Sequence, residues 1–364
     1  MAERVLITGG AGFIGSHLAD ELLAAGYAVR ALDALVDQVH DGGRPGYLSA
    51  DVELIPGDVR SEEVVRGALE GVDAVVHLAA RVGVGQSMYE QAEYAAANTF
   101  GTAVLLDALA ERPVRKVVVA SSMSVYGEGA YEPAPAVERT REQLERREWE
   151  PRGAGGEQLT PVPTPETKQP ALSSVYALTK FDQERLCLLF GSAYGVPAIA
   201  LRLFNVYGPR QALSNPYTGV LAIFASRLLN DNAPVVYEDG AQTRDFVHVA
   251  DVARAFRLAL EEDGADGRVV NVGRGRATSV LEIAETLARL LDRDVEPELP
   301  GTFRAGDIRH CIADVTLARE LLGFEAQVAL DDGLAELADW LQTQPATDRF
   351  DRAAAELAER GLTG

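Results

Sequence analysis

The sequence has very little cysteine: Cys187 and Cys311 are the only two among 364 residues. Two thiols so far apart provide neither a disulfide framework nor the C-x-x-C spacing of a structural zinc site. We therefore expect no bound metal and a reducing environment, that of the cytoplasm.

Long hydrophobic runs are also missing. No window approaches the roughly 18 consecutive apolar residues of a transmembrane helix. The first residues, MAERVLITGG, pass directly into a strand pattern without the basic and apolar regions of a signal peptide. The sequence thus predicts neither a membrane span nor a secretion signal.

Positive charge is scarce. The 34 lysines and arginines stand against 55 aspartates and glutamates, which gives a formal net charge of −21. Such a surface repels nucleic-acid phosphates and anionic membranes, so we expect neither as a partner. A small anionic ligand remains compatible, because local charge in a site can oppose the global field. The acidity otherwise favours solubility.

What the sequence does contain is a regular alternation of short apolar strands and helical patterns. The strands are rich in Val, Ile and Leu and most lack alternating polar residues, which is typical of a parallel sheet buried on both faces. The predicted strands are Arg4–Thr8, Ala28–Asp33, Val52–Asp58, Ala74–His77, Lys116–Ser121, Ala198–Phe204 and Val269–Val272. The helical patterns between them include Ser16–Ala25, Ser61–Leu69, Thr99–Glu111 and Ala177–Tyr194. This βαβαβ order predicts an α/β fold with a doubly wound parallel (Rossmann) sheet.

The predicted domain boundaries lie where the regular alternation of strands and helices ends. Residues 1–205 and 242–273 are predicted to form the sheet domain, and residues 206–241 and 274–345 a smaller C-terminal α/β lobe. Residues 346–364 form a tail, with an amphipathic helix predicted at Asp348–Arg360.

An insertion at residues 128–170 interrupts the sheet domain. Its first half is charged, with a short solvated helix predicted at Arg139–Trp149, and its second half is rich in Gly and Pro, as in an extended loop. A long irregular segment of this kind is either a tolerated surface insertion or a lid or subunit contact.

A glycine motif follows the first strand. Gly9, Gly12 and Gly15 have the spacing G-x-x-G-x-x-G, and a helix pattern opens at Ser16. Glycines here permit a tight turn and a close approach of the backbone to a pyrophosphate, while the helix N-terminus offers free N–H groups. Asp33, which closes the second strand, can accept hydrogen bonds from ribose hydroxyls and would repel a 2′-phosphate. The motif therefore predicts an NAD site, with NAD favoured over NADP.

The ends of the next two strands also belong to the expected ligand edge of the sheet. Asp58 could meet the adenine amino group, whereas His77 alone has the features of a core histidine.

A tyrosine and a lysine four residues apart, Tyr176 and Lys180, lie on one face of a predicted helix. A phenol with a pKa near 10 is a poor base, but a neighbouring ammonium and a positive nicotinamide favour the phenolate. A serine after the fifth strand, within Ser121–Ser124, can share the substrate's proton. The pattern predicts proton abstraction from a hydroxyl coupled to hydride transfer.

Taken together, the motifs resemble the extended short-chain dehydrogenase/reductases, the NAD-dependent epimerases, dehydratases and decarboxylases of nucleotide sugars. The resemblance covers residues 4 to about 340 and rests on TGGAGFIG, DV at 58, HLAA at 77, NTFGT at 98, SSMSVYG, YALTK, LRLFNVYGPR and RDFVHVADVA. It implies the catalytic trio Ser122, Tyr176 and Lys180, with Ser122 chosen because it precedes the tyrosine of VYG by four residues. The implied cofactor-binding residues are Gly9, Gly12, Phe13, Ile14, Gly15, Asp33, Asp58, Val59, Leu78, Ala79, Ala80, Asn98, Tyr176 and Lys180.

The resemblance also implies contacts to a nucleotide sugar in the smaller lobe, besides that of Ser122. Asn205 and Arg244 resemble residues that hold the pyrophosphate, while Arg304 and Asp307 resemble contacts to phosphate and ribose. Two arginines at one site are what a diphosphate needs in an acidic protein. The resemblance further implies a homodimer, in which the apolar helices Thr99–Glu111 and Ala177–Tyr194 of each subunit form a four-helix contact, unless these helices only cover the sheet.

The residues after Ser122 separate the possible reactions. The dehydratases of this group place Asp-Glu there and the decarboxylases keep a glutamate at the second position, whereas this chain has Met123 and Ser124. Neither side chain acts as a carboxyl acid or base, which favours epimerisation at C4 through a transient keto sugar. The insertion and residues 210–230 are similar to the 4-epimerases of 6-deoxyhexose nucleotides, the dTDP-L-rhamnose 4-epimerase group. A dehydratase or decarboxylase, a net dehydrogenase and an NAD-sensing protein remain alternatives.

Overall fold

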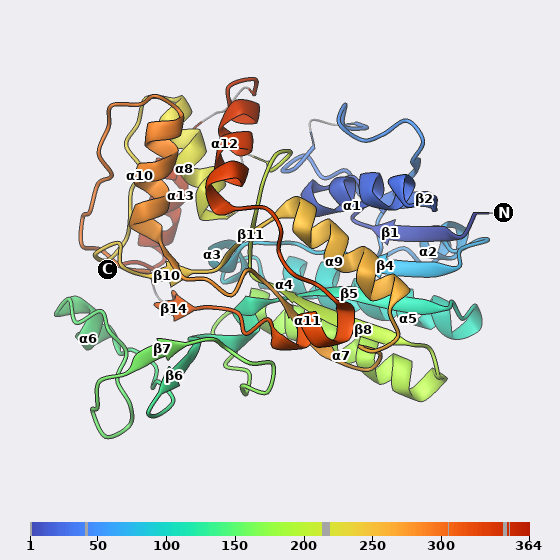
Figure 1. Cartoon of the computed structure of the whole chain (residues 1–364), viewed down its shortest axis with the longest axis horizontal. Coiled ribbons are helices and arrows are strands. Elements are labelled where there is room, and N and C mark those ends of the chain that lie inside the picture. The colour runs from blue at the N-terminus through green and yellow to red at the C-terminus, as the bar shows by residue number, and fades with distance from the viewer. Residues whose placement is uncertain (1, 41–42, 213–218, 305, 345–347, 349) are drawn as a thin grey trace.

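The computed structural model describes residues 2–40, 43–212, 219–304, 306–344, 348 and 350–364, and its centre is a seven-stranded parallel sheet (Figure 1). The strands are β1 (Arg4–Thr8), β2 (Ala28–Asp33), β3 (Glu53–Pro56), β4 (Ala74–His77), β5 (Lys116–Ser122), β8 (Ala198–Leu203) and β12 (Val269–Val272). Every residue of β5 and β8 is buried, as expected for central strands covered on both faces. All seven predicted strands are present, and the Rossmann prediction is confirmed.

The strand order is β12-β8-β5-β4-β1-β2-β3, so the chain reverses direction across the sheet between β1 and β4. At such a switch point the connections leave on opposite faces and open a crevice beyond the carboxyl ends of the strands. The crevice therefore lies beside Thr8 and His77, the last residues of these two strands.

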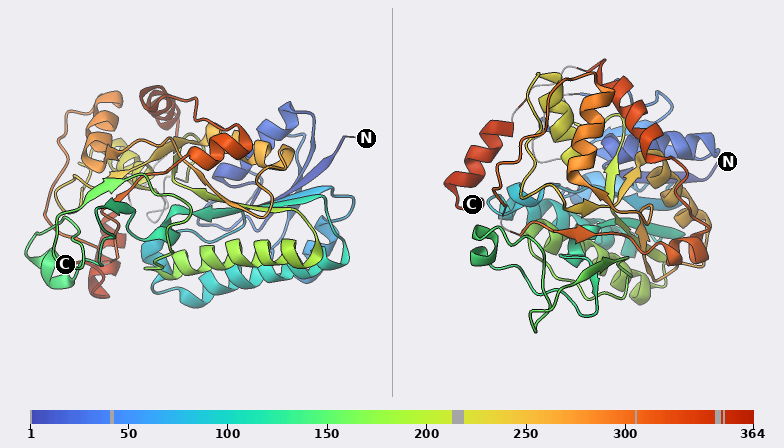
Figure 2. Two further views of the ribbon diagram at one scale, coloured as in Figure 1. Left: turned by 60° about the horizontal axis from the view of Figure 1, so that its bottom comes forward. Right: turned by 60° about the vertical axis from the view of Figure 1, so that its left-hand side comes forward.

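Helices cover both faces of the sheet, which separates two hydrophobic cores. One face packs against α1 (Phe13–Ala24), α9 (Val249–Glu261) and α11 (Thr316–Leu322), and the other against α2 (Glu62–Ala68), α5 (Gly101–Glu111) and α7 (Val175–Tyr194). Figure 2 shows α5 and α7 side by side beneath the sheet.

Several helix starts differ from the sequence prediction, and α7, for example, begins at Val175 and not at Ala177. Helix α1 begins at Phe13, three residues before the predicted start, because Gly12 already has the extended backbone of an N-cap. The predicted start at Thr99 falls within a π-helical turn, Ala95–Phe100, which runs directly into α5. Short helices α3 (Val84–Ser87) and α4 (Gln91–Tyr94) precede this turn.

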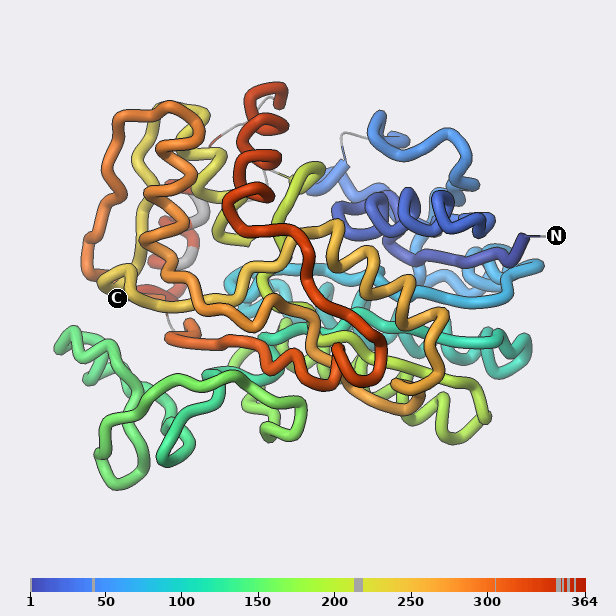
Figure 3. The backbone as a smooth tube through the Cα atoms, in the orientation of Figure 1, coloured from blue at the N-terminus to red at the C-terminus, as the bar shows by residue number. Residues whose placement is uncertain are grey.

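A second, smaller core lies beside the carboxyl edge of the sheet. Helices α8 (Val220–Leu229), α10 (Val280–Leu290) and α12 (Leu330–Leu341) share it, and Figure 3 shows them standing upright on the left. Short strands join this part to the sheet domain: β9 (Asn205–Tyr207) pairs with β11 (Phe246–His248), and β10 (Thr243–Arg244) lies between β13 (Thr278–Ser279) and β14 (His310–Cys311). A last helix, α13, spans Phe350–Glu359. Residues 213–218, within the quoted segment 210–230, and residue 349 of the predicted last helix lie outside the described residues.

The insertion is more ordered than its composition suggested. Strands β6 (Ala130–Glu132) and β7 (Thr160–Val162) pair antiparallel, and only Arg141–Glu145 (α6) of the predicted helix is helical. Trp149 and Leu144 pack against Phe303 in a small core of their own. The predicted helix was therefore wrong outside Arg141–Glu145, and the predicted extended loop was wrong at β7. A polar composition does not indicate which tertiary contacts a segment makes.

Candidate active site

A cavity of about 870 Å³ follows the carboxyl edge of the sheet and continues towards α8. The predicted site residues that line it are Gly9, Gly12, Phe13, Ile14, Gly15, Asp33, Asp58, Val59, Leu78, Ala79, Ala80, Ser122, Tyr176, Lys180, Asn205, Arg244, Arg304 and Asp307. Residues nearly 300 positions apart in the sequence thus meet at one cavity.

The glycine turn forms the floor of the cavity at β1. Gly9 has a φ of +71°, and a Cβ on Gly15 would lie 2.3 Å from the carbonyl oxygen of Gly9. No side chain caps α1, so the N–H groups of its first turn stay available to an anion. These are the properties that a dinucleotide pyrophosphate requires, and the turn fits NAD.

Two carboxylates, Asp33 and Asp58, lie at the carboxyl ends of β2 and β3. The side chain of Asp33 accepts the N–H groups of Ala11 (3.0 Å) and Leu35 (2.9 Å), which fix its orientation at the cavity wall. Asp58 is ion-paired with Arg60 at 2.7 Å. Burial raises the pKa of Asp58, but the hydrogen bonds from Arg60 outweigh it and hold the pKa below its usual value. Asp58 is therefore anionic at neutral pH, and the oxygens of both side chains can accept hydrogen bonds from ribose or adenine donors.

His77 is a core residue, as the sequence indicated. Its ring nitrogens contact Thr8 (2.7 Å), Thr102 (2.8 Å) and Gln183 (3.0 Å), and burial lowers its pKa to about 3. It is therefore neutral and positions the ends of β1 and β4.

Asn98 does not line the cavity. Its amide accepts the N–H of Arg81 (2.7 Å) and donates to the carbonyl of Arg81 and the hydroxyl of Thr179. The geometry gives it a supporting position beneath the loop after β4, and its predicted direct contact to the cofactor stays a prediction.

The reacting groups meet where β5 and the first turn of α7 approach each other. The Ser174 side chain caps α7 by accepting the N–H of Ala177, and Ser87 accepts the N–H of Tyr176 at 3.0 Å. The Tyr176 hydroxyl is hydrogen-bonded to Ser122, the last residue of β5. Lys180 lies one turn further along α7 and is buried.

Burial controls the protonation of this pair. It raises the pKa of Tyr176, and the hydrogen bond with Ser122 offsets this only in part. Burial also lowers the pKa of Lys180 to about 7. In the protein without its cofactor desolvation therefore dominates, and the joint effect of Lys180 and a positive nicotinamide on the phenolate stays a prediction.

Two supporting residues escaped the sequence analysis. Gln183 accepts from Lys180 Nζ at 2.6 Å and links it to the Ala79 carbonyl, and its position three residues after Lys180 on α7 was the available signal. Ser124 donates both its hydroxyl (2.8 Å) and its N–H (3.2 Å) to Ser122 Oγ. The lone pairs of Ser122 are thereby occupied, and its own proton is left to point towards Tyr176 or a substrate.

At the opposite end, two arginines surround one carboxylate. Asp307 pairs with Arg304 at 2.8 Å and with Arg244 at 3.3 Å. Burial raises the pKa of Asp307, but the two guanidinium groups reverse this and lower it to about 2. The buried Oδ1 atom of Asn205 has no hydrogen-bond partner in the described part of the chain. The cluster keeps one net positive charge, which suits a diphosphate.

The tail also reaches the cavity. Phe350, Ala354 and Leu362 are among the lining residues, and Gly364 exchanges two backbone hydrogen bonds with Phe303. The amphipathic pattern predicted a helix here, but nothing in it indicated where the helix docks.

Within the described residues, no helix is long and apolar enough to cross a membrane. The same residues hold no group of three or more His, Cys, Asp or Glu side chains placed to bind a metal ion.

Comparison with known proteins agrees with this geometry. The profile described as "NAD dependent epimerase/dehydratase family" matches residues 5–273. A dTDP-L-rhamnose 4-epimerase from Burkholderia thailandensis is 36% identical over 351 residues, which cover 93% of this chain and 95% of that protein. A UDP-N-acetyl-alpha-D-glucosaminuronate decarboxylase from Bacillus cytotoxicus is 31% identical over 94% of this chain and 98% of its own.

Solved structures give the same result. The UDP-glucose 4-epimerase of Thermotoga maritima, solved with UDP-glucose, has a TM-score of 0.78 at 33% identity and covers 93% of this chain and 98% of its own. The Thermus thermophilus enzyme of the same name, solved with NAD, has a TM-score of 0.76 at 30% identity and covers 94% and 100%. NAD is thus the cofactor of the chain. With a family profile over most of its length and relatives above 30% identity over nearly all of it, the chain belongs to the NAD-dependent epimerase/dehydratase family.

Proposed function

We propose that the chain is an NAD-dependent 4-epimerase of a dTDP- or UDP-linked hexose or 6-deoxyhexose. Residues 1–205 and 242–273 would bind NAD, and residues 206–241 and 274–345 the nucleotide sugar. The convergence of the glycine turn, the Tyr176 pair and the arginine cluster on one cavity supports this division.

The chemistry needs one proton acceptor and one holder of the substrate oxygen. Tyr176 takes the proton of the C4 hydroxyl while Ser122 holds that oxygen, and Lys180 stabilises the phenolate when protonated. Bound NAD would supply the acceptor for the C4 hydride and the donor for its return, and its positive ring would favour the phenolate. The keto sugar must turn its other face towards the hydride before the return. Tyr176 then gives the proton back to the oxygen of the keto sugar, so that only the configuration at C4 has changed.

The observation that carries the choice of reaction is the position of the carboxylates. Among the described residues that line the cavity, they are Asp33, Asp58, Glu93 and Asp307. Asp33 lies three strands away from β5, which corresponds to about 14 Å. Asp58 lies a further strand away, where Arg60 pairs with it and with Glu93, while Asp307 is held by two arginines. Beside Ser122 stand Met123 and Ser124, neither of which can drive a dehydration.

Mass spectrometry of the reaction in heavy water tests this choice. Incubation with dTDP-, UDP- and GDP-sugars should give a product of unchanged mass with no solvent deuterium at C5 or C6, and NMR identifies the inverted carbon. A product lighter by one water would instead identify a 4,6-dehydratase, and loss of carbon dioxide a decarboxylase. Stoichiometric release of NADH would identify a net dehydrogenase, and absence of any turnover would favour an NAD-sensing protein.

A homodimer is the second part of the proposal. Most of the apolar residues of α5 and α7, including Leu105, Leu109 and Phe190, are buried against the sheet. Other apolar residues remain exposed on the outer side of α7 and at the end of the π-helical turn that leads into α5, namely Phe100, Leu178, Leu189 and Tyr194, with exposed fractions of 46–59%. Such a row on two adjacent helices suits an isologous four-helix contact. Light scattering at micromolar concentration should give twice the chain mass, whereas a monomer would refute it.

We also propose a cytoplasmic location, with a nucleotide sugar rather than nucleic acid or a membrane as the partner. Cys187 and Cys311 are buried free thiols, which is compatible with a reducing compartment. Cell fractionation with antibody detection would test it, and recovery in a membrane or exported fraction would contradict it.

A further inference from the structure

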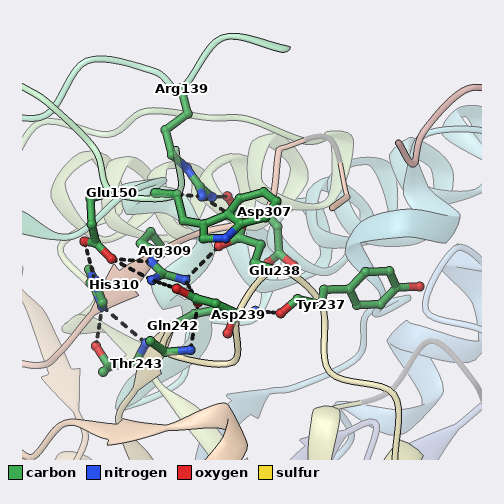
Figure 4. Close-up of polar contacts among 12 residues, drawn as sticks. Arg139, Glu150, Tyr237, Glu238, Asp239, Gln242, Thr243, Asp307, Arg309 and His310 are labelled. Atoms are coloured by element: carbon green, nitrogen blue, oxygen red, sulfur yellow. Dashed lines mark hydrogen bonds and ion pairs between the residues drawn. The ribbon is translucent and has the colours of Figure 1, made fainter. Parts of the chain in front are cut away.

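Two charged side chains of the insertion, those of Arg139 and Glu150, contact the segment that carries Asp307. Figure 4 shows this cluster, in which Arg139 and Glu150 from the insertion approach Glu238, Asp307 and Arg309 from the smaller lobe. These five residues lie in loops, so their contacts are not part of the hydrogen bonding of a helix or a sheet. We therefore ask which part of the molecule the contacts keep in position.

Arg139 makes the most direct connection. Its side chain is only 4% exposed, and Nη2 donates to the main-chain carbonyl of Asp307 at 2.8 Å. Nη1 donates to Glu238 at 2.7 Å and to the Trp149 carbonyl at 3.1 Å. The guanidinium group thus ties the insertion to the residue on which the two phosphate-side arginines converge.

Glu128 and Glu150 continue the connection along the same segment. Glu128 accepts the main-chain N–H groups of Arg309 (2.8 Å) and His310 (3.2 Å). Glu150 accepts from the side chains of both residues, at 2.6 Å from Arg309 and 3.1 Å from His310. The insertion therefore holds three residues of the segment 307–310, namely Asp307, Arg309 and His310.

Arg309 connects the insertion to Arg244 of the arginine cluster. It is 1% exposed and pairs with Glu238 at 2.9 Å and Asp239 at 2.7 Å, and its carbonyl accepts from Arg244 at 3.1 Å. Buried ion pairs contribute little net stability, because desolvation offsets the attraction, but they restrict geometry. A network of this size is thus better suited to fixing a conformation than to stabilising the fold.

We propose that the insertion braces the nucleoside-diphosphate site: Arg139 and Glu150 are positioning residues that hold segment 307–310, and with it Asp307, Arg244 and Arg304, in the ligand-binding conformation. The inference rests on the proposed function, because it assigns the arginine cluster to the diphosphate of the substrate. It predicts that the insertion acts on substrate affinity and leaves the Tyr176 chemistry and NAD binding unchanged.

The chain offers a matched control. Arg146 belongs to the same insertion, but its pair with Glu148 is solvent-exposed on both sides, and such pairs have little effect. Arg139→Met and Arg146→Met therefore remove the same charge from the same segment, and only the first removes the contact with Asp307.

Calorimetry with dTDP and UDP, on the full chain with its NAD, is the decisive experiment. Losing a charge-assisted hydrogen bond that positions the site should raise the Kd about 10-fold or more for Arg139→Met, with a parallel rise in KM. For Arg146→Met the change should stay below about twofold, as for surface pairs. In both variants kcat and NAD content should match the wild type. Equal Kd values in the two variants, or a fall in kcat without a change in Kd, would overturn the brace.

If Arg139→Met fails to fold, Glu150→Gln takes its place, because Arg309 keeps Glu238 and Asp239. It should weaken diphosphate binding about threefold, the effect of one weakened hydrogen bond, and unchanged binding would overturn the inference. The proposed function can fail independently of the brace. If the wild-type chain binds dTDP or UDP but turns over no nucleotide sugar, the proposed reaction is refuted, while the effect of Arg139 on diphosphate binding can still be measured. Wild-type protein that binds neither diphosphate overturns the brace itself.

Discussion

The two ends of the cavity are built in different ways. At the cofactor end, one strand, one turn and one helix form the glycine turn within residues 4–24, and Gly9 and Gly15 meet through backbone geometry. At the nucleotide end, three segments around residues 139–150, 237–244 and 303–309 are brought together by side-chain ion pairs. A local motif thus determines the first end, whereas a network of distant charges determines the second.

This difference teaches how each end tolerates change. At the glycine turn, an added side-chain atom at a tight contact such as Gly15 should abolish cofactor binding. In the network of ion pairs, each contact that is removed should weaken ligand binding by a further step. The reacting groups lie between the two ends and depend on neither alone, so that substitutions there should affect rate rather than affinity.

The largest effect should come from Tyr176→Phe. Loss of the phenol removes the proton acceptor, which typically costs about 10²- to 10⁴-fold in kcat. Bound NAD, measured after denaturation, should remain at the wild-type level because the glycine turn is untouched. A variant with more than about a tenth of wild-type kcat would remove Tyr176 as the base.

Gly15→Ala tests the claim that the cofactor end fails on addition of one atom. The new Cβ would lie 2.3 Å from a backbone oxygen, so the turn must distort, at a cost of about 1–3 kcal/mol in stability and with loss of most bound NAD. Gly67→Ala in α2 is the matched control, since a Cβ there meets nothing within 4 Å. Retention of NAD by Gly15→Ala would show that the comparison between the two ends is wrong.

Ser124→Ala should have a smaller effect, confined to the reacting centre. Removing its hydroxyl leaves Ser122 with one donor fewer, worth about 1 kcal/mol, and kcat should fall about fivefold with KM unchanged. Ser124→Thr keeps the hydroxyl and should restore the rate. Equal rates for the alanine and threonine variants would contradict the orienting contact.

The last effect concerns the dependence of stability on pH and not the activity. His77 has an ordinary pKa of 6.5 when unfolded and about 3 when folded, so between these values the unfolded chain binds the extra proton. The free energy of unfolding should therefore rise with pH across this window, by at most about 1.4 kcal/mol per unit from this group. Urea unfolding of the wild type and of His77→Asn should show a shallower slope for the variant. Identical slopes would mean that His77 is not buried as a neutral residue.

The sequence predicted most of the fold because the strands of the sheet are encoded locally. All seven strands lie within two residues of their predicted ends, and the glycine motif and the Tyr176–Lys180 pair lie on the cavity. The rest depended on tertiary contacts. Nothing in the residues near Arg139 indicates that it reaches the carbonyl of Asp307, 168 positions away. The burial that raises the pKa of Tyr176 could likewise not be predicted from the sequence, because burial is a property of the folded chain.

The brace has a consequence for engineering. The residues around the proposed diphosphate site come from three stretches of chain, and each stretch carries charges that the others neutralise. Replacing any one of these stretches with that of a relative would leave a buried carboxylate or guanidinium group without its ion-pair partner, which is strongly destabilising. A hybrid enzyme with altered substrate preference should therefore require all three stretches to be exchanged together, and libraries that vary them one at a time should yield mostly misfolded or inactive chains.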